Sequence, residues 1–163
     1  MTILETGSLA SHFTLLGLDG REYSLPASLD GKPALLVFFK TTCATCDLTF
    51  PYLNRLRQSH RDGWQLWAIS QDTADKARPY ATRHGLTYPV LLDAPAFTAS
   101  RLYDPPATPT LFLVAANGRI DYTTYGFAKD DVNEIERRLA EQLGENSQPL
   151  APENDGNPRF KPG

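Results

Sequence analysis

The sequence predicts an α/β fold built on a central mixed β-sheet with helices on both faces. One observation is the apolar run Ala34–Phe39, which suits a strand that is buried on both sides of a sheet. A second is that segments with strand and helix patterns alternate along the chain, and right-handed crossovers between strands then place helices on both faces. The length of 163 residues allows one such domain to bury its core without crosslinks.

The N-terminal part of the chain predicts a β-hairpin. Residues 13–25 alternate between apolar and polar around Asp19 and Gly20, a pair that suits the positive dihedral angles of a tight turn. Breakers at residues 31–33 then separate this hairpin from the buried strand Ala34–Phe39.

A helix is predicted directly after the only two cysteines of the chain. It is expected to open at the cysteines and to reach about His60, with Thr42 as a suitable N-cap. Pro51 should kink it, because proline lacks the amide proton and crowds the preceding turn. The apolar residues that recur there at helical spacing are Leu48, Tyr52, Leu53 and Leu56.

The following segments complete an alternating α/β pattern. Four of them predict strands, at residues 65–70, 90–92, 110–115 and 119–125, the last two joined by the hairpin signal Asn117-Gly118. Three predict helices, at residues 74–84, 96–103 and 130–143, the last from the spacing of Ile135, Leu139 and Leu143.

The composition of the chain changes after Gly144. Residues 1–144 carry the predicted strands and helices and are expected to form one domain. Residues 145–163 are rich in Pro, Asn, Gly and charge, with too few large apolar side chains to offset the entropy of ordering. The sequence therefore predicts a disordered polar C-terminal tail.

The two cysteines, Cys43 and Cys46, are separated by two residues at a predicted strand-to-helix junction. A helix N-terminus stabilises a thiolate, which is the form that attacks disulfides. Residues three apart face the same side of a helix, so the spacing permits a reversible disulfide. Cys43 should be the exposed nucleophile, and Cys46 should resolve the mixed disulfide. The alternative is that both are ordinary buried residues.

Two neighbouring residues are candidates for tuning the pKa of the thiol. Lys40 could lower it through its charge, although a solvated residue at a strand end is the simpler interpretation, and Asp47 would oppose it. Thr42, directly before Cys43, is the second candidate. No metal or cofactor is expected, because a structural zinc needs four ligands and the histidines of the chain are isolated.

Charge and hydropathy limit the partners. The formal net charge of −3 does not provide the excess of basic residues that nucleic-acid binding needs. No apolar window approaches the length of a membrane span. The N-terminus lacks the pattern of a secretory signal, which predicts a cytoplasmic monomer, or an extracytoplasmic one if a leader was removed.

A combination of motifs in this chain resembles the thioredoxin-like redoxin family. The cysteine pair, Pro51 five residues after Cys46, and Thr108-Pro109 directly before a strand occur together. With the N-terminal hairpin, the match is to the TlpA- and ResA-like branch, which is related to AhpC/TSA proteins. The resemblance implies a three-layer fold and a cis-Pro109 beside the cysteines. It further implies that Thr108 pairs with an extended substrate segment.

The same resemblance implies a thiol-disulfide oxidoreductase that exchanges with protein or small-molecule disulfides and with an unidentified redox partner. The chain departs from the pattern at four positions. Thr42 and Thr45 replace the usual tryptophan and proline of the motif, and Val37 and Thr49 stand where relatives carry acidic proton handlers. These departures leave open how Cys46 is deprotonated.

Two other functions remain open at the level of sequence. A peroxidase on the same fold would need a Pro-x-x-x-Thr-x-x-Cys pattern, but the threonine position holds Lys40 when measured to Cys43 and holds Cys43 when measured to Cys46. A non-enzymatic redox sensor or binding module would form and break the disulfide with negligible turnover.

Overall fold

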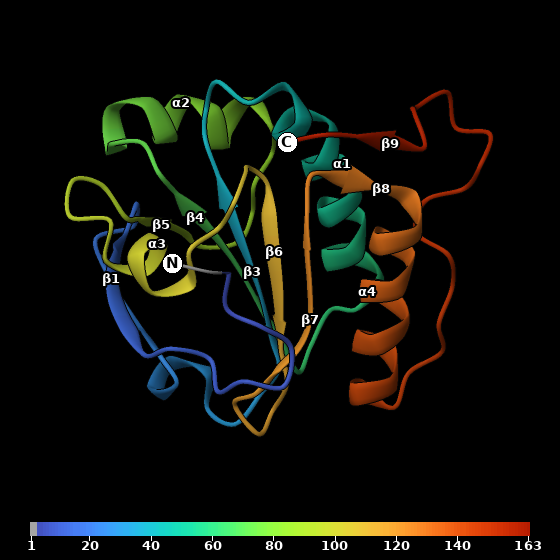
Figure 1. Ribbon diagram of the computed structural model, residues 1–163, viewed down its shortest axis with the longest axis horizontal. Coiled ribbons are helices and arrows are strands. Elements are labelled where there is room, and N and C mark those ends of the chain that lie inside the picture. The colour runs from blue at the N-terminus through green and yellow to red at the C-terminus, as the bar shows by residue number, and fades with distance from the viewer. Residues whose placement is uncertain (1–2) are drawn as a thin grey trace.

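A seven-stranded mixed sheet forms the centre of the molecule in the computed structural model, which describes residues 3–163 (Figure 1). Its strand order is β2-β1-β5-β4-β3-β6-β7, and β8 and β9 form a separate two-stranded sheet. The strands are β1 (Phe13–Gly17), β2 (Glu22–Leu25), β3 (Ala34–Phe39), β4 (Gln65–Ser70), β5 (Val90–Leu92), β6 (Thr110–Val114), β7 (Ile120–Tyr125), β8 (Phe127–Ala128) and β9 (Phe160–Lys161).

The middle strand, β3, has neighbours of both orientations. It pairs parallel with β4, where Leu36 lies opposite Trp67, and antiparallel with β6, where Leu36 lies opposite Phe112. β5 continues the parallel part next to β4, and the hairpin β1–β2 adds antiparallel strands at that edge. The sheet is therefore mixed, as the sequence predicts.

The helices cover both faces of the sheet. They are η1 (Ala27–Leu29), α1 (Ala44–Ser59), α2 (Ala74–Arg83), α3 (Thr98–Tyr103) and α4 (Lys129–Leu143). Buried residues of α1, α2 and α4 belong to one apolar cluster, whereas those of α3 and η1 belong to a second. Within residues 3–163, no helix has the length and apolar character needed to cross a bilayer.

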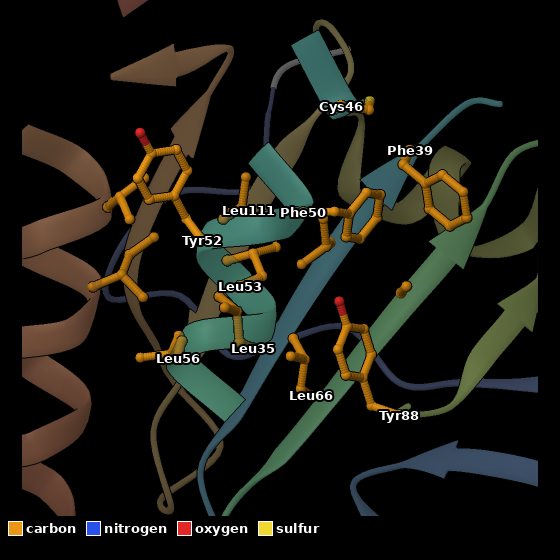
Figure 2. Packing of buried hydrophobic residues seen from close by; sticks show 14 of the residues in the cluster. Leu35, Phe39, Cys46, Phe50, Tyr52, Leu53, Leu56, Leu66, Tyr88 and Leu111 are labelled. Carbon is orange, nitrogen blue, oxygen red and sulfur yellow. The ribbon is translucent and has the colours of Figure 1, made fainter. Parts of the chain in front are cut away.

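Strand β3 contributes to both apolar clusters because its side chains alternate between the two faces. Leu35, Val37 and Phe39 join the cluster under α1, and the residues between them join the cluster under α3. Figure 2 shows Phe50 and Leu53 of α1 in the first cluster, with Leu35 and Phe39 of β3. This packing fixes the beginning of α1 beside the end of β3.

The element boundaries differ from the prediction in small ways. α1 continues as one helix of 16 residues with Pro51 inside it, and α3 begins at Thr98, two residues later than expected. The short strands β8 and β9 were not foreseen, because two-residue strands leave no periodic pattern in a sequence.

The C-terminal tail differs from the prediction of disorder. Residues 145–163 run along α4 and then turn back towards the N-terminal end of α1 (Figure 1). Leu150 and Ala151 are buried in the cluster under α1, and the side chain of Asn133 hydrogen-bonds to the backbone of both residues. These two apolar residues, with their backbone groups hydrogen-bonded, hold the segment in place. Composition alone does not reveal such isolated anchors.

Buried charges of the domain also bind the tail. The ammonium group of Lys129 donates to the carbonyls of Pro152 and Glu153 and to the carboxylate of Asp155 at 2.6 Å. His60 lies between the carboxylates of Glu136 and Glu145, at 2.8 and 2.6 Å from its two ring nitrogens. The tail thus supplies the partners of Lys129, whose buried charge would be costly if unpaired, and a second carboxylate for His60, which already faces Glu136 of α4.

Candidate active site

The cysteine pair lies at the first turn of α1, directly beyond the end of β3. Cys43 is the N-cap residue, and its Sγ accepts a hydrogen bond from the backbone N–H of Cys46 at 3.1 Å. The prediction that Thr42 caps this helix is therefore wrong, because the sulfur of the next residue fills that role. Cys43 is partly exposed and Cys46 is fully buried, both as free thiols.

The Thr108–Pro109 loop lies against the cysteine pair. The peptide bond between these residues is cis, and the thiol of Cys43 donates to the carbonyl of Thr108 at 3.2 Å. Thr110 begins β6, the antiparallel neighbour of β3, so sheet pairing brings the loop and the cysteines to the same end. Residues 65 positions apart in the chain thus form one site.

The environments of the two thiols are different. Burial, followed by the hydrogen bond with Cys43, raises the pKa of the Cys46 thiol far above its ordinary value. Cys46 is therefore a neutral thiol near pH 7, while Cys43 presents its sulfur at the helix N-terminus. The two thiols therefore differ in exposure and in their ease of deprotonation, the properties on which the reactivity of a cysteine depends.

The two candidates for pKa tuning lie at the periphery of the site. The side chains of Lys40 and Thr42 are exposed, and within residues 3–163 neither side chain has a hydrogen bond to a cysteine. Against the larger effect of burial, a backbone hydrogen bond of Lys40 does act to lower the pKa of the Cys46 thiol. The loop between β3 and α1 is instead held by Thr41, whose backbone N–H and hydroxyl both donate to Asp72, at 2.7 and 2.9 Å.

Val37 and Thr49 stand where the family resemblance implies acidic residues, and neither is placed to handle a proton. Val37 is part of the core under α1, and the hydroxyl of Thr49 donates to the backbone carbonyl of Thr45 at 2.7 Å. Neither side chain can accept a proton from Cys46.

A polar cluster that sequence reasoning missed lies on the α2 side of the pair. The Tyr80 hydroxyl donates to Asp47 at 2.7 Å, and Nε2 of His84 lies 3.5 Å from the same carboxylate oxygen. Burial and this hydrogen bond raise the pKa of Tyr80. Tyr80 and His84 are four residues apart in the sequence, and this spacing could have indicated that they share one face of the predicted helix.

Thr45, inside the motif, makes a second contact that the sequence did not indicate. Its hydroxyl donates to the carbonyl of Pro162 at 2.7 Å. The partner lies 117 positions away in the tail that composition predicted to be disordered, so no local pattern could have revealed the contact.

A metal centre finds no support in the side-chain arrangement of residues 3–163, because no group of three or more His, Cys, Asp or Glu side chains is placed to hold an ion. The groups that the site offers are two sulfurs, a backbone carbonyl and the helix N-terminus. Their chemistry is that of thiols and disulfides.

A dithiol at the N-terminus of a helix, facing a cis-proline loop on a mixed sheet, defines the class of thioredoxin-like redox proteins. The AhpC/TSA family model matches residues 6–123, and the chain belongs to this family. The predicted membership in the thioredoxin-like redoxin family is confirmed.

Relatives with similar sequences carry names of the same class. The thiol-disulfide oxidoreductase ResA of Geobacillus kaustophilus is 31% identical over 141 residues, covering 85% of this chain and 78% of the relative. ResA of Geobacillus thermodenitrificans is 30% identical over 136 residues, covering 82% and 77%.

Solved structures show the same fold. A candidate thiol:disulfide interchange protein DsbE from Chlorobium tepidum superimposes with a TM-score of 0.78 at 27% identity, covering 86% of this chain and 99% of that one. The thioredoxin domain of a thiol-disulfide oxidoreductase from Bacteroides vulgatus gives a TM-score of 0.74 at 24% identity, covering 83% and 99%. The predicted three-layer thioredoxin-like fold is confirmed.

Proposed function

We propose that this protein is a thiol-disulfide oxidoreductase in which Cys43 is the nucleophile and Cys46 the resolving thiol. The observation that carries the proposal is the position of the Cys43 sulfur. It lies between the N–H of Cys46 and the carbonyl of Thr108, at the partly exposed end of α1. The buried Cys46 lies one turn further along the same helix.

In the first step, the thiolate of Cys43 attacks one sulfur of a substrate disulfide. The S–S bond of the substrate breaks, a mixed disulfide forms on Cys43, and the other substrate sulfur leaves as a thiolate that takes up a proton. The hydrogen bond from the N–H of Cys46 and the helix dipole stabilise the negative charge on the attacking sulfur.

In the second step, Cys46 loses its proton and attacks the sulfur of Cys43. The mixed disulfide breaks, the second substrate thiol leaves, and a Cys43–Cys46 disulfide forms. The substrate gains two electrons and the protein loses two, which a thiol donor must later restore. Because Cys46 is buried, its sulfur reaches Cys43 more readily than it reaches a bulky substrate.

The partners follow from this chemistry. The substrate is a protein or small molecule that carries a disulfide, and the electron donor is an unidentified thiol. Thr108 pairs with an extended substrate segment beside Cys43, since the adjoining Pro109 contributes no N–H that would compete. A monomeric state is part of the proposal, as is a cytoplasmic location, or an extracytoplasmic one if a leader was removed.

Trapping of a mixed disulfide tests the assignment. Cys46→Ser should accumulate a covalent adduct through Cys43 when a disulfide substrate is added, because the resolving thiol is missing. Cys43→Ser is the matched control and should trap nothing. If Cys46→Ser forms no adduct, Cys43 is not the nucleophile and the proposal fails.

Peroxide reduction is the second candidate, favoured by the match to the AhpC/TSA family. Hydrogen peroxide would oxidise Cys43 to a sulfenic acid and release water, and Cys46 would then close the disulfide and release a second water. Peroxide consumption that is faster than turnover of insulin disulfides, and lost in Cys43→Ser, would select this function. Disulfide formation without turnover of either substrate would indicate a sensor.

A further inference from the structure

The end of the tail lies on the face where the substrate is proposed to bind. We call residues 159–163 the C-terminal strap. Figure 1 shows it passing from β9 to a point beside the beginning of α1. The carbonyl of Pro162 accepts a hydrogen bond from Thr45, which lies between the two cysteines.

The contact of the strap with the Thr108 loop is close. A Cβ atom placed on Gly163 would lie 2.6 Å from the carbonyl oxygen of Thr108 and 2.9 Å from the Cβ of Ala107. The same carbonyl accepts from the thiol of Cys43. Only a residue without a side chain fits in this position.

The strap also lies close to Gly126 of the domain, at somewhat longer distances. A Cβ atom on Gly126 would lie 3.1 Å from the carbonyl oxygen of Lys161 and 3.2 Å from the nitrogen of Gly163. The N–H of Gly126 itself donates to the carbonyl of Pro109 at 2.9 Å. With the strap in this place, Pro109 is buried.

The strap is attached much more weakly than the part of the tail before it. Upstream, the buried Lys129 binds Asp155 at 2.6 Å. The strap itself is held by the two residue pairs of β8 and β9, by the backbone N–H of Lys129 donating to Arg159, and by the hydrogen bond from Thr45 to Pro162. Its ion pairs, from Arg159 to Asp130 and Glu153, join exposed side chains. Exposed ion pairs contribute little, and short, solvent-accessible pairings open first. The strap can therefore leave while the rest of the tail stays bound.

From these contacts we infer that the C-terminal strap is an internal occupant of the peptide-binding face beside Cys43. A segment of a protein substrate must displace it before exchange. The inference rests on the proposed function of Cys43 and Thr108. It identifies the displacing ligand as an extended polypeptide segment with a glycine opposite Thr108 and a backbone carbonyl facing the hydroxyl of Thr45.

The full-length variant Gly163→Val tests the inference, because the added side chain collides with the backbone carbonyl of Thr108 and should release the strap. Asn154→Val is the matched control, since it places the same side chain on an exposed tail residue away from the site. Rates of reduction of insulin and of a small aromatic disulfide are measured for both variants and the wild type. Loss of one hydrogen-bonded contact should raise the ratio of the insulin rate to the small-disulfide rate about fivefold in Gly163→Val.

A second readout does not depend on activity. The peptide Arg-Phe-Lys-Pro-Gly, added to Gly163→Val, should shift the NMR signals of Thr45 and Thr108 back towards their wild-type positions and lower the insulin rate. A peptide ending in Pro-Val should do neither. An unchanged rate ratio together with no peptide-induced shifts would overturn the inference. If neither the wild type nor either variant turns over a disulfide, the proposed function is rejected instead. The peptide-induced NMR shifts would then show by themselves whether the strap occupies this face.

Discussion

At the scale of single residues, the two cysteines of the pair differ in burial and in hydrogen bonding. Cys43 has its sulfur at the end of α1 with two hydrogen-bond partners, whereas Cys46 is enclosed by the core under that helix (Figure 2). A thiolate is the reactive form of cysteine, so burial of Cys46 suppresses its reactivity towards solutes. In the proposed mechanism, this arrangement separates attack on the substrate by Cys43 from release of the product by Cys46.

Selective alkylation follows from this difference in burial and in the raised pKa of Cys46. Brief treatment of the reduced protein with iodoacetamide near pH 8 should modify Cys43 and leave Cys46 free until the protein is unfolded. Peptide mass spectrometry assigns the modified residue, and the urea-unfolded protein, in which both should react, is the control. Equal modification of both residues in the folded protein would contradict the geometry described for the pair.

The sequence predicts where these two residues lie in the fold, because spacing and position at a strand-to-helix junction are local features. It also predicts that Thr108 and Pro109 lie beside them. It misses the N-cap role of Cys43 and the contact from Thr45 to Pro162, since one depends on a sulfur acting as acceptor and the other on a distant partner.

At the scale of elements, the tail is an ordered part of the fold whose attachment depends on charge. Burial alone would lower the pKa of His60, but its hydrogen bonds to Glu145 and Glu136 outweigh burial and raise the pKa above 6.5. Both ring nitrogens face carboxylates, so the protonated form of His60 joins α1, α4 and the tail by two ion pairs.

The pH dependence of stability follows from the raised pKa of His60. A raised pKa contributes stability that is fully present below the unfolded value and is lost as pH rises through the folded value. Thermal unfolding between about pH 6 and about pH 9 should therefore show a falling midpoint. Glu145→Gln removes one of the two carboxylate charges that face His60 and should flatten this slope, and Glu153→Gln, at an exposed tail carboxylate, should not. Equal slopes in all three proteins would exclude His60 as the cause.

The strands and long helices were predictable because their apolar periods are strong, as in Ala34–Phe39 and in the helix after the cysteines. The ordered tail was not. Its anchors are single apolar residues, Leu150 and Ala151, and polar partners supplied by Asn133 and Lys129 of α4. Composition averages over such isolated contacts and so indicates disorder.

At the scale of the whole molecule, two apolar clusters on opposite faces of one sheet hold the site in place. β3 belongs to both, and the cysteines follow it directly in the chain. The position of the pair therefore depends on packing across the full thickness of the fold, which a local motif cannot specify.

Substitutions on each face should show that both clusters contribute to stability. Leu53→Ala, in α1, and Leu36→Ala, in β3 on the side of α3, each remove a fully buried side chain and should lower the free energy of unfolding by about 2–5 kcal/mol. Leu16→Ala, at a residue that is 50% exposed, is the control and should change it by about 0.5 kcal/mol or less. Urea titration gives the values, and a loss confined to one face would argue against a jointly stabilised sheet.

A redox titration of the full-length protein tests the central claim most directly. The protein is equilibrated with mixtures of a reduced and an oxidised small thiol, and the free thiols are counted at each potential. We expect both thiols to disappear together in one two-electron transition with a midpoint between about −270 and about −120 mV, the range spanned by known dithiol proteins. Two thiols that remain free under the most oxidising mixture would contradict the claim that Cys43 and Cys46 exchange disulfides.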